Sequence, residues 1–198
     1  MSHRRVILAS ASPRRRDLLT MLGIAHEVLP AEIDERYLPG EPPIAHTERL
    51  AREKGAVIAA RAPDAVVIAA DTIVVIDDVV LGKPRDDAEA AAMLRRLAGR
   101  THTVFTAVAV SRGGRIESGV EAVTVTFRPL DDETIRAYIA TREPMDKAGA
   151  YGIQGYGAAI VERIDGDYFA VMGLAIGRML ALLRRLGVRY DFAGLDPA

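Results

Sequence analysis

The chain has 198 residues, a formal charge of −1 and no cysteine. The near-neutral charge excludes a general attraction to duplex nucleic acid, so any anion must bind at a local cluster. The absence of cysteine excludes disulfide bonds and cysteine-ligated metals. No apolar run reaches the roughly 18 residues of a membrane-spanning helix, and no signal peptide is recognisable. We therefore expect a cytoplasmic protein with one domain over residues 1–190 and a tail at 191–198.

The hydrophobic pattern of the first half alternates strands with helices. A short apolar strand is expected at residues 6–9, and Ser12-Pro13 then starts a helix that ends at Gly23, because serine caps a helix and proline suits its first position. The other elements predicted here are a strand at 25–29, a long helix from Pro43 to about 62, a buried strand at 65–76 and a strand at 79–81.

In the second half, hairpins interleave with helices. Strands at 104–110 and 116–128 are joined by Gly113-Gly114, since glycine supplies the positive φ of a tight turn. This arrangement predicts a mixed α/β fold with a largely antiparallel sheet. The other elements expected are helices at 86–99, 131–140 and 174–186, a second strand pair at 158–163 and 168–172, and a frayed end after Tyr190.

Arginine crowds the start of the first helix. The segment Ser10-Ala11-Ser12-Pro13-Arg14-Arg15-Arg16 puts three cations in the first turn, where the helix dipole is already positive and backbone N–H groups are unpaired. A bound anion would relieve this repulsion. The segment therefore predicts a phosphate site, with hydroxyl donors from Ser10 and Ser12 and bidentate contacts from Arg14 and Arg15. A solvated arginine face is the alternative.

One carboxylate interrupts the most apolar strand. Asp71 lies in the middle of residues 65–76, where an ionised group is costly unless it is paired, hydrogen-bonded or bound to metal. Asp34 and Glu35 supply further carboxylates in a loop, which could complete an oxygen-ligand site for Mg²⁺ or Mn²⁺. A structural aspartate that accepts backbone N–H groups is the alternative.

Lysine and glutamine are rare in this chain. Of 26 basic residues only Lys54, Lys83 and Lys147 are lysine, and Gln154 is the single glutamine. A position that keeps lysine can need a compact ammonium for a phosphate. Lys83 lies in Gly82-Lys83-Pro84, which is not a P-loop because proline replaces the Ser or Thr. An ordinary turn lysine is the alternative for Lys83, and pairing with Asp146 is the alternative for Lys147.

A glycine-rich segment follows Lys147. Its four glycines at 149–157 allow the backbone to approach a ligand closely, and Tyr151 and Tyr156 offer stacking faces. The amide of Gln154 complements N3–H and O4 of uracil or thymine, but equally the N6/N7 edge of adenine. A structural glycine loop is the alternative. His3, His46 and His102 have no metal-ligand spacing and are interpreted as structural or surface residues.

These segments together resemble the Maf family of nucleoside triphosphate pyrophosphatases, in the branch that acts on dTTP and UTP. The resemblance extends from Val6 to about Leu186. The motifs that carry it are Ala9-Ser10-Ala11-Ser12-Pro13-Arg14-Arg15, Ile33-Asp34-Glu35, Arg49-Leu50-Ala51-Arg52-Glu53-Lys54, Ala70-Asp71-Thr72, Gly82-Lys83-Pro84, Gly99-Arg100-Thr101-His102, residues 146–155 and residues 171–174.

The resemblance implies a metal-dependent hydrolase with an ITPase-like fold of two lobes with a cleft between them. Asp71 would be the catalytic carboxylate, and Glu35 would help it to hold Mg²⁺ or Mn²⁺. The residues implied to bind the substrate are Arg14, Lys54 and Lys83 for the triphosphate, Thr72 and Gln154 for specificity, and Ser10, Ser12 and Arg15 as support for the phosphate cradle.

The resemblance also implies a homodimer. The near-neutral charge and the lack of a long apolar run predict no stable nucleic-acid partner and no membrane association. Two other functions stay open at this stage. One is the same chemistry on another nucleotide, such as 7-methyl-GTP. The other is a nucleotide-binding regulator of septum formation in cell division.

Overall fold

The computed structural model describes residues 5–197, so the predictions for His3 and for the last residue of the tail lie outside this range. The contacts divide the chain into two compact units. The first comprises the chain up to Asp71, Thr106–Glu121 and the chain from Gly173 onward, and the second comprises Thr72–Phe105 and Ala122–Met172. No helix of the described part is long and apolar enough to cross a membrane.

A seven-stranded sheet has the order β2-β1-β3-β5-β6-β7, with β4 paired to β3. β1 is parallel to β2 and β3, whereas β3–β4 and β6–β7 are antiparallel. A separate antiparallel pair joins β8 and β9. The strands are β1 (Val6–Leu8), β2 (Glu27–Val28), β3 (Val66–Ile76), β4 (Val79–Leu81), β5 (Thr101–Arg112), β6 (Arg115–Phe127), β7 (Val161–Asp165), β8 (Val188–Tyr190) and β9 (Leu195–Pro197).

Most helices begin where the sequence predicts. The carboxylate of Asp86 accepts the N–H of Glu89 and that of Asp131 accepts the N–H of Thr134, both at 2.8 Å, so each caps its helix. The α-helices are α1 (Pro13–Met21), α2 (Pro43–Arg61), α3 (Asp87–Leu97), α4 (Asp132–Ala140), α5 (Tyr168–Met172) and α6 (Ile176–Arg185). Short 3-10 helices are η1 (Glu143–Asp146), η2 (Ala148–Ala150) and η3 (Gly155–Ala159).

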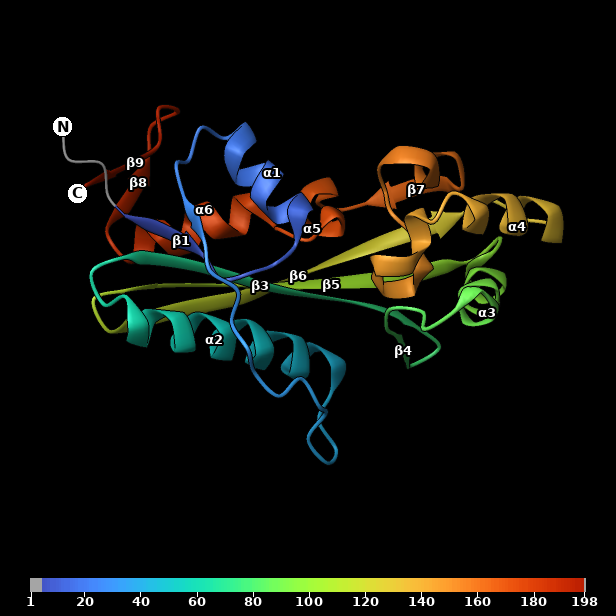
Figure 1. Cartoon of the computed structure of the whole chain (residues 1–198), viewed down its shortest axis with the longest axis horizontal. Helices are drawn as coiled ribbons and strands as arrows, with labels where there is room; N and C mark the ends of the chain where they lie inside the picture. Colours follow the sequence, from blue (N-terminus) through green and yellow to red (C-terminus); the bar gives the residue numbers. More distant parts are fainter. Residues whose placement is uncertain (1–4, 198) are drawn as a thin grey trace. The chain divides into compact units, whose positions relative to one another are not determined.

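The first unit is layered around β1 and the start of β3. Helix α2 covers one face of these strands, and α1 and α6 lie on the other (Figure 1). Ile58 of α2 packs in a buried cluster with Ile7, Val67 and Ala69. Because side chains alternate along a strand, residues 67, 69 and 71 of β3 all face α2.

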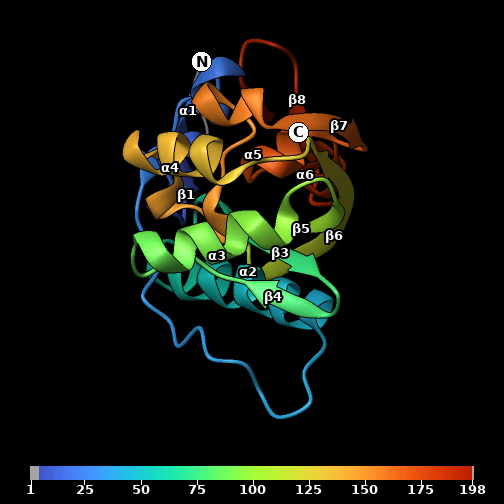
Figure 2. The same cartoon turned by 90° about the vertical axis from the view of Figure 1, so that its right-hand side faces the viewer.

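The second unit is held by an aromatic cluster and by paired helices. Phe127, His102 and Tyr151 make edge-to-face contacts with centroid distances of 4.7–5.3 Å. Helices α3 and α4 lie side by side (Figure 2) and are joined by an ion pair of 2.7 Å between Arg95 and Asp132.

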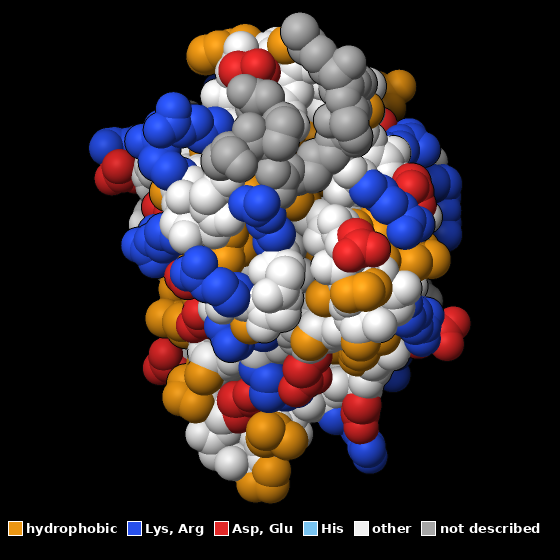
Figure 3. Space-filling model, turned by 90° about the vertical axis from the view of Figure 1, so that its left-hand side faces the viewer, with side chains coloured by type: hydrophobic (Ala, Val, Ile, Leu, Met, Phe, Trp, Pro, Cys, Tyr) orange, Lys and Arg blue, Asp and Glu red, His pale blue; other side chains and the backbone are white. Residues whose placement is uncertain are grey.

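On the face of the molecule in Figure 3, basic and acidic side chains are interspersed, as the near-neutral composition predicts.

Two local predictions are wrong. Residues 168–172 form helix α5 instead of a strand, because the carboxylate of Asp167 accepts the N–H of Phe169 at 2.8 Å and turns the chain. The strand at 161–165 pairs with β6 instead. The segment expected to fray after Tyr190 contains β9, which pairs with β8.

The packing of α2 generates a stability prediction. Replacing fully buried Ile58 by alanine leaves a cavity against the sheet and is expected to lower the free energy of unfolding by about 2–5 kcal/mol. Ile44→Ala on the same helix, where the side chain is 47% exposed, should change it by less than about 0.5 kcal/mol. Urea unfolding measures both, and equal effects would contradict this packing.

His102 generates a pH prediction. It donates or accepts one hydrogen bond with the Tyr151 hydroxyl at 2.8 Å, and its Nδ1 has no partner among the described residues. Burial lowers the pKa of His102 from 6.5 to about 4. As the pH falls, the unfolded chain therefore takes up this proton before the folded chain does. The contribution of neutral His102 to the free energy of unfolding is complete above pH 6.5 and decreases steadily as the pH falls to about 4.

The expected loss is about 3 kcal/mol, from a shift worth about 1.4 kcal/mol per pKa unit. Unfolding curves of the wild type and of His102→Gln between about pH 7 and about pH 4 isolate it. The difference between their free energies of unfolding should shift by that amount in favour of the variant. Parallel pH profiles would show that His102 does not stay neutral in the fold.

Candidate active site

The centre of the site is an ammonium held between two carboxylates. The Nζ atom of Lys54 lies 2.7 Å from Oδ1 of Asp71 and 2.8 Å from Oε1 of Glu35. The side chains of Lys54 and Asp71 are each 12% exposed, whereas that of Glu35 is 60% exposed. Two carboxylates and one ammonium therefore meet at a site that is buried at Asp71 and Lys54 and open at Glu35.

The helical period of α2 and the alternation of side chains along β3 explain why Lys54 and Asp71 lie together. Lys54 is four residues after buried Leu50 and four before buried Ile58, so it lies on the stripe of α2 that faces the sheet. Asp71 continues the face of β3 that carries Val67 and Ala69 toward α2. The buried charge of Asp71 thus finds a partner on the helix that packs over it, as such a charge requires.

Arg15 ties the start of α1 to the strand that carries Asp71. Its guanidinium donates to the carbonyl oxygen of Ala70 at 2.8 Å, to Oγ of Ser10 at 3.0 Å and to the carbonyl oxygen of Gly173 at 2.7 Å. Burial lowers the pKa of Arg15, and the nearby Asp71 charge opposes that shift. These contacts make Arg15 a support of the backbone around Asp71.

The other residues at the start of α1 lie beside Arg15. Ser12 caps the helix without a side-chain hydrogen bond, and its N–H donates to Oγ of Ser10 at 3.2 Å. Arg14 is half-buried and its charge lowers the pKa of Arg15. Arg16 is exposed and pairs with Asp17 at 3.0 Å. The first turn carries no acidic residue, so a positive helix start lies close to the Asp71 pair.

Of the acidic loop residues, Glu35 joins Asp71 and Asp34 does not. The carboxylate of Asp34 accepts several hydrogen bonds from Arg36, which lower its pKa. No group of three or more His, Asp or Glu side chains that could hold a metal occurs within residues 5–195. His46 and His102 are buried and belong to packed clusters, as their structural interpretation predicts.

Three predicted substrate residues lie in the second unit. Thr72 follows Asp71 on β3 and is half-buried, whereas Lys83 and Gln154 are exposed. The turn with Lys83 is joined to the glycine loop, because the carbonyl oxygen of Gly82 accepts the N–H of Gly149 at 3.0 Å. The second unit therefore brings the Lys83 turn and the loop with Gln154 together.

The glycine loop is shaped by a carboxylate that the sequence did not single out. Glu143 accepts the N–H groups of Tyr156 and Gly157, both at 2.9 Å, and the hydroxyl of Tyr138 at 2.9 Å. That hydroxyl in turn accepts the N–H of Gly152 at 3.1 Å. A Cβ on Gly157 would overlap the carbonyl oxygen of Gly152, so the loop needs glycine there.

Lys147 serves the same loop. Its Nζ donates to Oδ1 of Asp146 and to the carbonyl oxygen of Glu143, both at 2.6 Å. This contact matches the alternative that pairs Lys147 with Asp146. No local sequence pattern points to Glu143 or Tyr138, because both act on backbone groups 13 or 14 positions away.

Comparisons with known proteins agree on one family. Residues 5–186 match the family described as "Maf-like protein". A protein of Syntrophomonas wolfei named dTTP/UTP pyrophosphatase is 52% identical over 91% of this chain and 96% of its own length. A protein of Moorella thermoacetica with the same name is 51% identical over 93% of this chain and 96% of its own length.

The solved structures that it resembles are more distant. A HAM1 protein from Coxiella burnetii has a TM-score of 0.46 at 16% identity, covering 93% of this chain and 98% of that one. A nucleoside-triphosphatase described as dITP/XTP pyrophosphatase, from Mycobacterium abscessus, has a TM-score of 0.42 at 15% identity, covering 91% and 94%. The family match and the close relatives both span most of the sequence, and the chain belongs to the Maf family.

Proposed function

We propose that this chain hydrolyses the α–β phosphoanhydride bond of dTTP and UTP, giving the nucleoside monophosphate and pyrophosphate. The pairing of Lys54 with Asp71 and Glu35 carries the proposal, because it places a base and a cation at one site. The names of the relatives at 43–52% identity support the choice of substrates.

The two carboxylates fit a hard divalent cation, Mg²⁺ or Mn²⁺. Their oxygens converge on one ammonium, so a cation can reach both. Mg²⁺ commonly takes one or two protein carboxylates and fills its shell with water and substrate phosphate. Asp71 and Glu35 would hold this ion, which supplies charge neutralisation at the phosphates.

Asp71 is the catalytic carboxylate of the proposed reaction. It accepts a proton from a water molecule while the water oxygen forms a bond to the α-phosphorus. The bond from that phosphorus to the bridging oxygen breaks, and its electron pair leaves with pyrophosphate. Arg14, Lys54 and Lys83 stabilise the negative charge of the triphosphate and of the leaving group.

The remaining assignments follow the chemistry of each side chain. Gln154 offers a donor and an acceptor to the O4 and N3–H edge of uracil or thymine, and its exposure leaves that amide available. Thr72 is assigned to specificity as well. Ser10, Ser12 and Arg15 support the phosphate cradle at the start of α1, and Arg15 does so through the backbone it holds.

The family resemblance implies a homodimer, and the sequence composition predicts a cytoplasmic protein. Both stay predictions for this chain, and sedimentation of the purified protein measures the first of them.

A panel of nucleoside triphosphates tests the proposed reaction. With Mg²⁺ or Mn²⁺ present, we expect monophosphate and pyrophosphate from dTTP and UTP in preference to the purine nucleotides and 7-methyl-GTP. Asp71→Asn should lower kcat by about 10²–10⁴-fold, the usual contribution of a general base. Asp77→Asn is a control in an exposed ion pair with Arg100 and should leave turnover unchanged.

Two outcomes would contradict this assignment. Full turnover by a folded Asp71→Asn variant would remove the catalytic role of Asp71. Nucleotide binding without release of pyrophosphate from any member of the panel would favour a regulatory protein over a hydrolase.

Lys54 generates a prediction about the metal. Its ammonium and a divalent cation compete for the same carboxylate oxygens. Two positive charges bound to the same carboxylates repel each other. Lys54→Met should therefore bind Mn²⁺ more tightly than the wild type in the absence of nucleotide, by about tenfold, or about 1.4 kcal/mol. The same variant should lose turnover, because the phosphates lose a cation.

Electron paramagnetic resonance of free Mn²⁺ measures this affinity. Lys147→Met is the matched control, since Lys147 pairs with Asp146 in the second unit, and its Mn²⁺ affinity should equal that of the wild type. Weaker Mn²⁺ binding by Lys54→Met would place the cation away from Asp71 and Glu35.

A further inference from the structure

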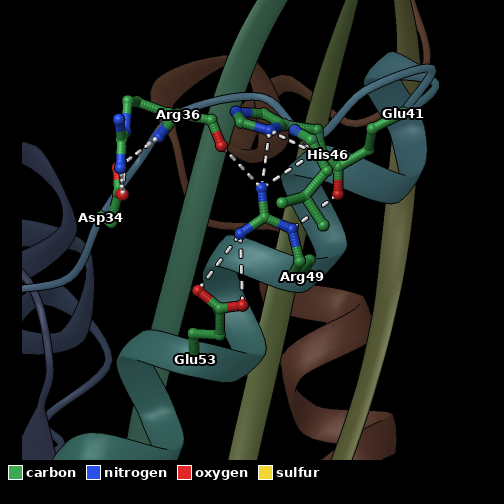
Figure 4. Close-up of polar contacts among 7 residues, drawn as sticks. Asp34, Arg36, Glu41, His46, Arg49 and Glu53 are labelled. Atoms are coloured by element: carbon green, nitrogen blue, oxygen red, sulfur yellow. Dashed lines mark hydrogen bonds and ion pairs between the residues drawn. The ribbon is translucent and has the colours of Figure 1, made fainter.

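A cluster of charged side chains surrounds Arg49 on α2, five residues before Lys54 (Figure 4). The guanidinium binds the carboxylate of Glu41 through two parallel hydrogen bonds of 2.6 and 2.8 Å. It also donates to the carbonyl oxygen of Arg36 at 3.0 Å and to both oxygens of Glu53 at 3.2 Å. The fork of an arginine is suited to this arrangement, since it presents several donors in one plane.

Glu41 is the residue through which the loop before α2 binds this cluster. Its Oε2 accepts the N–H of Leu38 at 3.1 Å and lies 2.9 Å from Nδ1 of His46, whose ring stacks on Tyr37 at 3.5 Å. The hydrogen bonds from Arg49 lower the pKa of Glu41 to about 2. Glu41 therefore stays ionised at neutral pH and keeps its bonds to the arginine.

These contacts define the shape of the segment that carries Glu35. The backbone from 29 to 42 forms no helix or strand, so its course is not fixed by a ladder of backbone hydrogen bonds. Glu35 itself is 60% exposed and gains little from burial. The carboxylate of Glu35 nevertheless lies 2.8 Å from Nζ of Lys54, so the segment reaches the site.

Arg49 contacts the neighbours of both site residues. The carbonyl that it binds belongs to Arg36, the residue after Glu35, and the side chain that it binds on α2 belongs to Glu53, the residue before Lys54. The guanidinium thus joins the backbone beside Glu35 to the helix turn that presents Lys54. Movement of this fork would move Glu35 relative to Lys54 and Asp71.

We propose that Arg49 is a positioning residue: together with Glu41 it clamps the segment 34–41 to α2 and so holds Glu35 beside Asp71. This inference rests on the proposed function, in which Glu35 and Asp71 bind the divalent cation. Arg49 does not touch the reacting atoms, and its effect is transmitted through Glu35. A solely structural ion pair would stabilise the fold without a specific effect on Glu35.

A double-mutant cycle distinguishes these roles, because residues that act through one another are non-additive. Arg49→Met should weaken Mn²⁺ binding by about tenfold and lower kcat for dTTP by a similar factor, and Glu35→Gln should do the same. The double variant should be no worse than Glu35→Gln alone. Both quantities are measured on the full chain, with Mn²⁺ alone as the probe in the binding experiment.

Arg52→Met is the matched control. Arg52 lies on the same helix and donates to Oγ of Ser118 at 2.8 Å, away from the segment of Glu35, so Mn²⁺ affinity and kcat should stay within about twofold of the wild type. Glu41→Gln removes the charge of the clamp and keeps its shape. It should reproduce a weaker form of the Arg49→Met result and serves as the second variant where Arg49→Met fails to fold.

Additive losses in the cycle, or wild-type Mn²⁺ affinity in folded Arg49→Met, would overturn the positioning role. Failure of the proposed function gives another pattern: no nucleotide of the panel is cleaved, while the Mn²⁺ cycle still reports on Arg49. Rescue by Arg49→Lys to wild-type levels in both readouts would also contradict the inference, because lysine cannot provide the bidentate fork.

Discussion

The ion pair between Lys54 and Asp71 is the interaction on which the rest of the site depends. A carboxylate on an apolar strand is costly unless a partner compensates it, and the partner comes from the helix that packs on that face. The same packing that buries Ile58 on the neighbouring turn fixes Lys54. Core and site are therefore built from one helix stripe, and disturbing the first displaces the second.

Local chemistry explains how much of the fold was predictable. Helix caps such as Asp86 and Asp131 act on the next turn of their own chain, so their sequence pattern is sufficient. Residues 168–172 read as a strand because their aromatic and branched side chains favour one. The turn made by Asp167 overrides that preference, and only the pairing of β7 with β6 reveals where the strand partner lies.

In the candidate site, too, local features were predictable from the sequence and contacts between distant elements were not. The burial cost of Asp71 predicted that it needs a partner, and the pattern around Lys54 suggested a phosphate contact, but their pairing depends on two elements meeting in space. Arg49 and Glu143 act through partners that are separated in sequence or lie in backbone groups. Neither residue type is unusual for a helix or turn. Arg49 is marked only by the family motif that contains it, and no sequence signal marks Glu143.

Arginine and lysine have different roles around the candidate site. Arg15 and Arg49 each bind several acceptors at once with a planar fork, and so fix backbone segments in place. Lys54 meets two carboxylates with a compact ammonium on a flexible stem, which in the proposed reaction turns toward the substrate phosphate. In a chain where only three basic residues are lysine, an ammonium at this position is the group that can exchange partners.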